Sequence, residues 1–511
     1  MKISIHILML PGFILPLSHA DVSLPVVIDS NMVLQRGIEA PIWGWADVGE
    51  KITVSFAGQE KTTTTDNTGS WKIKLDPLEA SSEGRALTVK GKNEIKLDNV
   101  LVGEVWICSG QSNMEWSVSR SLPKSRTLAA KENKNPNLRL FRVPAHIRAG
   151  SPLSDTVGTW TSCTSQNDIN NFSGVGFYFG RKLQHDLKVP IGLLDTSWGG
   201  TPIEAWISAE GYEMIRQPLP KPNEAQQKAL VESFKKLVDS VERWQVKARV
   251  AAAQGRVIPL PSHGNVNFGN SANGIYNAMV APLAPYGVKG AIWYQGEANR
   301  GRPFPDYFNK LKALIGGWKK IFEAGDFPFY IVQIAPFDYN RGNRKRDDTP
   351  LCKNVWAAEF KAAEEIPNCG VVPIHDTIQG NLRNIHPADK QTVGERLASL
   401  ALKDAYEKDV PWTGPLFKSA AQDDKQIVVT FEHIDKGLET SDGKAPSWFE
   451  IAGANKEFVA ADAAIEGATV VIKAEAVLNP KFVRMGWSEV AIPNLRDKNG
   501  WPVRQFTAGI K

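Results

Sequence analysis

The chain has 511 residues, 60 of them basic and 55 acidic for a net charge of +5, and an apolar fraction of 42%. This length exceeds one ordinary hydrophobic core, so two or three domains are expected, and the composition is that of a soluble globular protein. The near-balanced charge and the lack of a basic run give no sign of nucleic-acid binding.

The first twenty residues resemble a secretory signal. Lys2 supplies the positive start, residues 3–17 are mostly apolar, and the stretch ends on a small-x-small cleavage site at Ala20. A membrane anchor is the alternative, although two prolines break the short apolar run. We expect residues 1–20 to be removed, leaving an exported periplasmic or extracellular protein that has no stable membrane span.

Residues 21–99 follow an all-β pattern. Apolar and polar side chains alternate over 52–56 and again over 71–75, and a turn sequence, Asp66-Asn67-Thr68-Gly69, lies between them. This pattern predicts a small β-sandwich domain.

Residues 100–410 alternate short apolar runs with helical patterns, which is typical of an α/β domain built on a parallel sheet with helices on both faces. Helical patterns cover 177–187, 307–322 and 355–365. The five runs predicted to be strands are Val105 to Cys108, Ile191 to Leu194, Ala291 to Tyr294, Phe329 to Ile334 and Val371 to Ile374.

Two further segments flank this pattern or interrupt it. Residues 217–254 are charged and favour an exposed helical excursion, followed by a return rich in proline and glycine. From 411 to 511 the pattern is again β-like, with strand runs at 427–431 and 469–472, and predicts a C-terminal β domain or extension.

Four cysteines in an exported chain permit disulfides without requiring them. Cys352 and Cys369 flank about four helical turns, which would separate them by roughly 20 Å, so no bridge is expected between them. The spacings match no zinc pattern. The sequence leaves the disulfide state of Cys108 and Cys163 open.

The residue types needed for acyl transfer occur after the ends of the predicted strands. Ser112 comes after the first strand, Gly200 after the second, Asn299 after the third and His386 after the fifth. Working residues gather at the carboxyl ends of the strands in such sheets, so we expect these four to meet. An ordinary turn with a capping serine is the alternative for Ser112 alone.

Each of the four suggests a role. Ser112 would be the nucleophile and His386 the base that takes its proton, with His375 as a second candidate base. The Gly200 backbone N–H, the Ser112 backbone N–H and the Asn299 amide are candidate donors to the oxyanion, and such donors are worth about 3–4 kcal/mol each.

Four blocks resemble the sialate O-acetylesterase family, a branch of the SGNH hydrolases. They read SGQSNM; NFSGVGFYFGRKL with DTSWGGTPIEAW; IYNAMVAPLAPYGVKGAIWYQGEAN; and IHPADKQTVGERLA. The resemblance implies an SGNH-type, flavodoxin-like parallel five-stranded sheet. It also implies that Gly200 and Asn299 form the oxyanion site, that no metal or organic cofactor is used, and that an acetylated glycan is the substrate.

The third member of a catalytic triad is not evident. Many SGNH hydrolases place an aspartate three residues before the histidine, where this chain has Arg383. Asp376, Asn384 or a backbone carbonyl could orient the imidazole, or the enzyme could be weak or altered. Arg383 is instead a candidate ligand for an anionic substrate such as a sialic acid carboxylate.

Other residues near the motifs are candidate substrate ligands. Trp206 belongs to this group together with Gln111 and Glu297, although Glu297 is also expected to brace the site. Trp116 and Trp198 could likewise floor a sugar pocket or pack in the core.

The sequence therefore predicts an exported carbohydrate O-acetylesterase acting on sialic acid or related glycans. One alternative is the same chemistry on acetylated xylan, xyloglucan or another plant polysaccharide. Another is a carbohydrate-binding protein that kept the fold and lost activity. The oligomeric state stays open.

Overall fold

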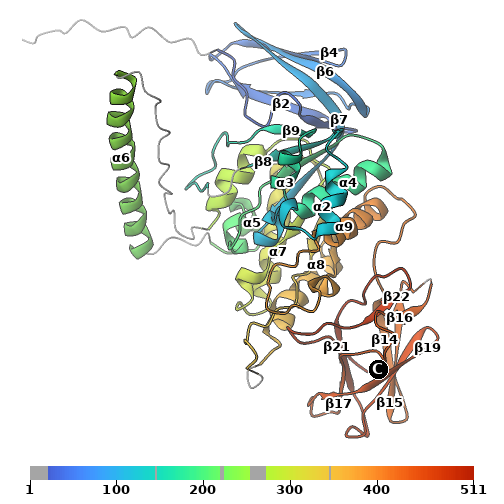
Figure 1. Ribbon diagram of the computed structural model, residues 1–511. Helices are drawn as coiled ribbons and strands as arrows, with labels where there is room; N and C mark the ends of the chain where they lie inside the picture. The colour runs from blue at the N-terminus through green and yellow to red at the C-terminus, as the bar shows by residue number, and fades with distance from the viewer. Residues whose placement is uncertain are drawn as a thin grey trace, which may run out of the picture.

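The computed structural model describes residues 21–143, 147–218, 224–253, 272–343, 347–434 and 436–510; the expected signal segment, residues 1–20, lies outside them. The chain forms N-terminal β-strands, a central sheet covered by helices, and C-terminal antiparallel strands (Figure 1). In the described ranges, no helix combines the length and apolar character that crossing a bilayer requires.

The N-terminal strands pair mainly antiparallel. β3 pairs with β4 and β6, β2 pairs with β5, and β1 adds in parallel to β7. The side chains predicted to face a core, such as Ile52, Val54 and Trp71, are buried. The strands are β1 Val33–Gln35, β2 Ala40–Trp45, β3 Lys51–Phe56, β4 Gln59–Thr64, β5 Ser70–Leu75 and β6 Ser81–Lys90.

Strand β7, Glu94–Gly110, belongs to both the N-terminal and the central sheet. Its first part pairs antiparallel with β6, and its last residues pair in parallel with β10 and β11. At about 3.3 Å per residue its 17 residues extend roughly 55 Å. Every residue from Val100 to Gly110 is buried. The expected domain boundary at residues 99 and 100 therefore falls inside one continuous strand.

The central sheet has the order β13-β12-β11-β7-β10-β8-β9, and all neighbours are parallel except β8 and β9. The five predicted strands correspond to β7, β10, β11, β12 and β13. The expected count of five is wrong, because β8 adds a sixth parallel strand and β9 an antiparallel edge. The bounds are β8 Asn135–Arg142, β9 Trp160–Cys163, β10 Ile191–Asp195, β11 Gly290–Tyr294, β12 Phe329–Val332 and β13 Cys369–Val372.

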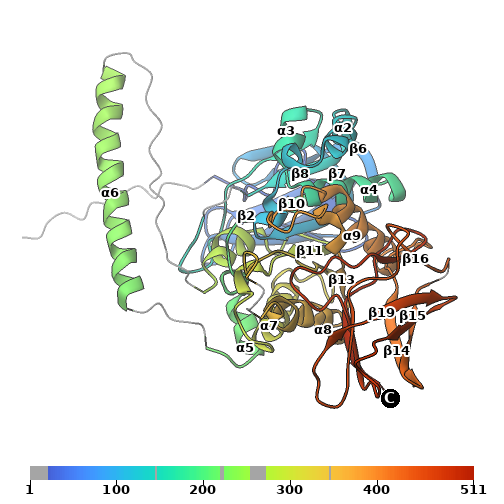
Figure 2. The same cartoon turned by 60° about the horizontal axis from the view of Figure 1, so that its bottom comes forward.

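Helices cover both faces of this sheet. Figure 2 shows α4 and α9 on one side, and α7 and α8 on the other. The α-helices are α1 Ser112–Glu115, α2 Pro123–Ala130, α3 Gln166–Asn171, α4 Gly174–Leu187, α5 Ala209–Met214, α7 Asp306–Ile321, α8 Ala357–Glu365 and α9 Lys390–Asp404. Shorter 3₁₀ and π turns are η1 Val118–Arg120, η2 Ile203–Trp206, η3 Tyr276–Val280, η4 Ala281–Leu283, η5 Glu297–Asn299, η6 Cys352–Trp356 and η7 His375–Ile378.

The predicted helical excursion is present as α6, Glu224–Ala253. Both views place this helix away from the sheets and from the other helices (Figures 1 and 2). The predicted return rich in proline and glycine, from 257 to 269, lies outside the described residues.

The C-terminal strands have a hydrophobic core of their own, which includes Ile427, Val470 and Phe506. Two four-stranded antiparallel sheets and one short pair account for them, in agreement with the β-like pattern of the sequence. The strands are β14 Leu416–Asp423, β15 Gln426–Glu432, β16 Leu438–Thr440, β17 Phe449–Ala452, β18 Val459–Ala460, β19 Asp462–Glu466, β20 Thr469–Lys473, β21 Phe482–Met485, β22 Leu495–Asp497 and β23 Phe506–Gly509. All four cysteines of the chain are free thiols.

Candidate active site

The turn after β7 carries the candidate nucleophile. Gly110 has a φ of +139°, and a Cβ at this position would overlap the carbonyl oxygen of Tyr294 on the neighbouring strand β11. Only glycine fits so close an approach with that backbone conformation. The Gln111 N–H then donates to the same Tyr294 oxygen at 2.9 Å. Ser112 follows as the first residue of α1, where a backbone N–H has no partner within the helix.

Ser112 and His386 lie within hydrogen-bonding distance. Ser112 Oγ is 2.8 Å from His386 Nε2, although the two residues are 274 positions apart in the sequence. His386 precedes α9, whose N-cap is Asp389, with a side chain that accepts from the Thr392 N–H at 3.1 Å. Pro387 therefore lies before the helix. The structure brings together the two groups on which acyl transfer would depend.

An aromatic ring lies against the imidazole. Trp116 stacks on His386 with ring centroids 4.7 Å apart and an interplanar angle of 17°. The guanidinium of Arg120 lies over the Trp116 ring, 5.2 Å from its centroid. Burial lowers the pKa of His386, and the positive charges of Lys390 and Arg120 lower it further. These effects favour the neutral imidazole, which is the form that accepts a proton from serine.

Neither side-chain candidate for the third triad member contacts the His386 ring. Both carboxylate oxygens of Asp376 accept hydrogen bonds from Arg396, at 2.7 and 2.6 Å. Asn384 Oδ1 accepts from the backbone N–H of His386 at 3.0 Å, so it orders the loop and leaves the ring alone. Across the part of the chain that the structure describes, no carboxylate is hydrogen-bonded to this imidazole. The expectation for Asp376 is therefore wrong.

The second candidate base is also excluded by its position. His375 is fully buried, and neither ring nitrogen has a hydrogen-bond partner. Burial lowers its pKa to about 4. It lies in η7, and it is absent from the cavity at Ser112.

The glycine turn after β10 lies directly beside Ser112. A Cβ on Gly199 would be 3.2 Å from Ser112 Cβ, whereas a Cβ on Gly200 would meet open space. The Gly199 N–H donates to Glu115 Oε2 at 2.7 Å. The Gly200 N–H has no acceptor among the described residues, and Gly200 has a φ of +72°. Its N–H thus remains available for a ligand.

The amide of Asn299 is fixed by a buried network. Its Oδ1 accepts from Gln295 Nε2 at 2.8 Å and from the Ile203 N–H at 3.0 Å. Its Nδ2 donates to Glu204 Oε2 at 2.8 Å, which occupies one of two amide hydrogens. Burial raises the pKa of Glu204, but hydrogen bonds from Lys310 and Asn299 more than offset this and hold it below the usual value. Asn299 therefore has a set orientation and one N–H to spare.

Two of the candidate substrate ligands support the site from within. Gln111 is buried, and its Oε1 accepts from Gln295 Nε2 at 3.0 Å. Glu297 Oε1 accepts from Asn113 Nδ2 at 2.6 Å. These contacts connect the turns after β7 and β11, so both residues brace the site, as was expected for Glu297.

The other two substrate candidates do not line the cavity at the nucleophile. Trp206 is fully buried and donates its Nε1–H to Thr201 Oγ1 at 2.9 Å, so its predicted contact with substrate is wrong. Arg383 is exposed and does not line the cavity at Ser112.

The cavity at the nucleophile has a volume of about 320 Å³. Sequence reasoning missed two arginines that line it, Arg120 in η1 and Arg142 at the end of β8. Arg142 donates to the Asn171 carbonyl at 3.1 Å and lies 3.8 Å from carboxylates of Glu115 and Asp195. The full lining is Ser112, Glu115, Trp116, Ser117, Arg120, Arg142, Asn171 and His386.

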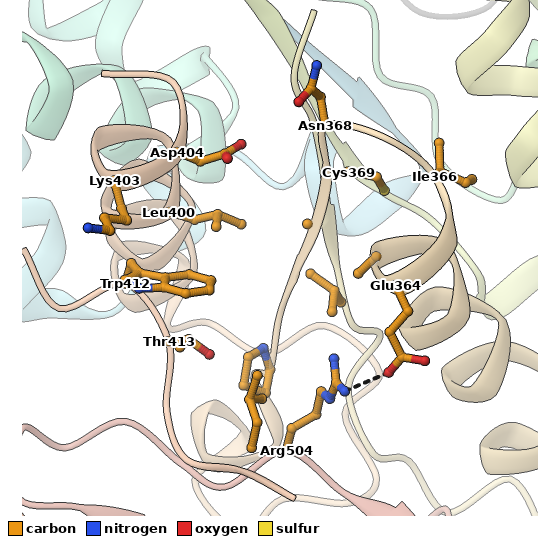
Figure 3. A pocket seen from close by; sticks show the side chains of 15 residues that line it. Glu364, Ile366, Asn368, Cys369, Leu400, Lys403, Asp404, Trp412, Thr413 and Arg504 are labelled. Atoms are coloured by element: carbon orange, nitrogen blue, oxygen red, sulfur yellow. Dashed lines mark hydrogen bonds and ion pairs between the residues drawn. The ribbon is translucent and has the colours of Figure 1, made fainter. Parts of the chain in front are cut away.

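A separate cavity of about 520 Å³ lies where α8, β13 and α9 meet the segment leading to the C-terminal strands. Figure 3 shows Trp412 on one side of it and the ion pair of Arg504 with Glu364, 2.9 Å long, on the other. It contains neither Ser112 nor His386. Within the described ranges, no group of three or more His, Cys, Asp or Glu side chains is arranged to hold a metal ion.

Comparisons with known proteins agree with this geometry. The family model described as "Carbohydrate esterase, sialic acid-specific acetylesterase" matches residues 102–236 and 260–403. Rat sialate O-acetylesterase is 31% identical over 422 residues, which cover 76% of this chain and 75% of the rat protein. The human sialate O-acetylesterase is 30% identical over 421 residues, covering 76% and 72%.

A solved structure is similar over almost the whole chain. The crystal structure of a carbohydrate acetylesterase from Xanthomonas citri has a TM-score of 0.78 and 31% identity, and the match covers 96% of this chain and 99% of that one. With the family model matching more than half of the residues, the chain belongs to the sialic acid-specific acetylesterase family of carbohydrate esterases.

Proposed function

We propose that this carbohydrate O-acetylesterase removes acetyl groups through a dyad of Ser112 and His386. The observation that carries the proposal is the 2.8 Å contact between Ser112 Oγ and His386 Nε2 at the wall of an open cavity. A serine hydroxyl is a weak nucleophile unless a neighbouring base takes its proton, and this contact supplies the base.

The reaction would proceed in two halves. Ser112 Oγ attacks the acetyl carbonyl carbon while its proton moves to His386 Nε2. The tetrahedral intermediate then expels the sugar oxygen, which takes that proton from His386 and leaves as an alcohol. In the second half a water molecule gives a proton to His386 and attacks the acetyl-enzyme. Release of acetate returns the proton to Ser112.

Three N–H groups would stabilise the developing oxyanion. They are the backbone N–H groups of Ser112 and Gly200 and the second amide hydrogen of Asn299. The orientation of Asn299 is fixed by Gln295 and Glu204, so this donor needs no reorganisation when charge appears.

The dyad would operate without a carboxylate partner. Stacking of Trp116 and the hydrogen bond from the His386 N–H to Asn384 limit movement of the imidazole. Burial and nearby positive charge favour its neutral form. We therefore expect a lower catalytic rate than that of an enzyme with a complete triad.

For the substrate we propose an acetylated sialic acid or a related acidic glycan. Arg120 and Arg142 line the cavity beside Ser112, and guanidinium groups suit a carboxylate. Relatives named sialate O-acetylesterase share about 30% of the sequence. A neutral acetylated plant polysaccharide, such as xylan or xyloglucan, is the second candidate, because the similar structure from Xanthomonas citri carries the broader description of a carbohydrate acetylesterase.

We further propose an SGNH-type, flavodoxin-like core. Numbered along the chain, the five predicted strands lie in the sheet in the order 2-1-3-4-5, with β8 and β9 added at one edge. The proposed domains are 21–99, 100–410 and 411–511, the first two sharing strand β7, with residues 1–20 directing export to the periplasm or the outside of the cell.

The decisive experiment measures acetate release from an aryl acetate by the parent protein and by Ser112→Ala. We expect a loss of about 10³-fold or more. Equal rates would refute the esterase mechanism, and retained sugar binding would then favour a binding protein.

A second measurement addresses the substrate. Arg120→Gln is expected to raise KM about 10-fold for an O-acetylated sialic acid, through loss of a charge-assisted contact, and to leave hydrolysis of a neutral aryl acetate within about threefold. Equal effects on the acidic and the neutral ester would contradict recognition of a carboxylate by this arginine.

A further inference from the structure

Asn113, the residue after the proposed nucleophile, is fully buried and makes three side-chain contacts. Its Nδ2 donates to the carbonyl oxygen of Ile385 at 3.0 Å and to Glu297 Oε1 at 2.6 Å. Its Oδ1 accepts from Lys390 Nζ at 2.5 Å. Both ends of the amide are therefore occupied, and its orientation is determined.

The contacts of Asn113 join three separate segments. Asn113 follows β7, Glu297 follows β11, and Ile385 belongs to the loop that ends in the first turn of α9. Ile385 immediately precedes the base, His386. A single side chain thus links the turn that carries the nucleophile to the loop that carries the base.

Lys390 holds this amide from the far side. It is the first residue of α9 and is fully buried. Its Nζ lies 5.1 Å from the centroid of the Tyr294 ring and 6.0 Å from that of Trp116. Aromatic faces favour a cation, and Glu297 on the other side of Asn113 carries the opposite charge.

The charges across the amide depend on one another. Burial lowers the pKa of Lys390 to about 7, while the carboxylates of Glu297 and Asp389 raise it. Burial raises the pKa of Glu297 above its usual value, and the hydrogen bond from Asn113 and the charge of Lys390 offset this only in part. The charged form of each group is therefore stabilised by the opposite charge of the other, and the Asn113 amide lies between them.

We propose that Asn113, held between Lys390 and Glu297, is the positioning residue that sets the distance between Ser112 and His386. This inference rests on the proposed function. Many hydrolases orient the histidine by a carboxylate on its ring, and the described part of this chain offers none there. Asn113 performs the task through the main chain of the base loop, because its amide fixes the Ile385 carbonyl one residue before His386.

The test combines Asn113→Ala with a matched control. Asn277 is also buried, and its Nδ2 likewise donates to a backbone carbonyl, that of Ala149 at 3.0 Å, but it lies outside the cavity at Ser112. Misplacement by about 1 Å can cost about 100-fold in rate. We expect Asn113→Ala to lose about 100-fold in kcat on an aryl acetate with KM within threefold. Asn277→Ala is expected to lower the melting temperature and to keep kcat within threefold.

Two further variants keep the test decisive if Asn113→Ala does not fold. Asn113→Asp preserves the shape and the acceptor for Lys390 but removes the donors to Ile385 and Glu297, so it too should lose kcat.

Lys390→Met removes the hydrogen bond that holds Asn113 Oδ1, and it should lower kcat on the aryl acetate as well. Any of these three variants that folds and retains kcat within fivefold would overturn the proposal. If Ser112→Ala were as active as the parent, the proposed function would fail instead.

Discussion

Trp116→Ala removes the ring that stacks on the proposed base. Stacked aromatic pairs contribute about 0.5–1.5 kcal/mol beyond burial, and the 4.7 Å, nearly parallel contact with His386 is of this kind. If that energy serves to orient the imidazole, its loss lowers kcat/KM by about two- to thirteenfold, since 1.36 kcal/mol corresponds to about tenfold in rate.

The same substitution also predicts a change in pH dependence. Burial is the main cause that lowers the pKa of His386, ahead of the charges of Lys390 and Arg120. Without the ring, water reaches the imidazole and its pKa rises towards about 6.5. The neutral form is the active one, so activity is lost first on the acid side and the acid limb moves to higher pH.

The assay for Trp116→Ala is kcat/KM for an aryl acetate measured from pH 4.5 to 8.5. Trp116→Phe is the control, because a smaller ring still covers the imidazole and should keep most of the activity and an acid limb close to that of the parent. A Trp116→Ala protein with an unmoved acid limb and a rate within twofold at every pH would refute the reasoning.

Three further substitutions give distinct outcomes. Gly110→Ala would press a methyl group against the Tyr294 carbonyl oxygen, so a melting temperature several degrees lower is expected, and an unchanged value would contradict the tight turn. Asp376→Asn breaks the ion pair with Arg396 and should lower the melting temperature while kcat stays within about threefold; a loss of about 10³-fold would make it a triad member. The pKa of Lys390 is lowered from 10.5 to about 7 in the folded protein. Between about pH 7 and 10.5 the unfolded chain therefore binds more protons at this residue than the folded protein does, so the free energy of unfolding rises with pH. We expect the Lys390→Met protein to lack that rise in the free energy of unfolding, measured with urea at pH 7.5 and 9.5. The same pH dependence in the parent and in the variant would contradict this expectation.

The sequence predicted the features that depend on strand periodicity. Strands β7, β10, β11, β12 and β13 are short apolar runs, and residues that follow parallel strands meet at one edge. This is why Ser112 and His386 could be placed together across 274 positions. The helical patterns at 177–187 and 307–322 correspond to α4 and α7 within a few residues.

Features that depend on tertiary partners could not be predicted. Strand β8 contains Arg139, which argues against a buried strand until its partners are known. Arg139 is 1% exposed, and its guanidinium donates to the Asn31 carbonyl at 3.0 Å and to Asn99 Oδ1 at 3.2 Å, both in the N-terminal region. Because β8 was missed, Arg142 at its end was missed as a cavity residue.

Side-chain direction caused the other errors. Trp206 was a candidate for sugar contact because it lies in a motif, but its Nε1–H donates to Thr201 within the core. Asp376 follows the fifth strand as predicted, yet Arg396 on α9 takes both of its oxygens. No periodic pattern in a single sequence reports which partner a buried polar group selects.

The long strand β7 runs without interruption from the N-terminal sheet to the catalytic turn, so the two are rigidly connected. A domain joined by a flexible linker can change its orientation, or be deleted, without disturbing its neighbour. Here the same run of peptide units is hydrogen-bonded to β6 near one end and leads into the Gly110 turn at the other. The N-terminal sheet is consequently held at a constant orientation to the esterase cleft, and deleting the first hundred residues would cut β7 only a few residues before its pairing with β10 begins at Glu104.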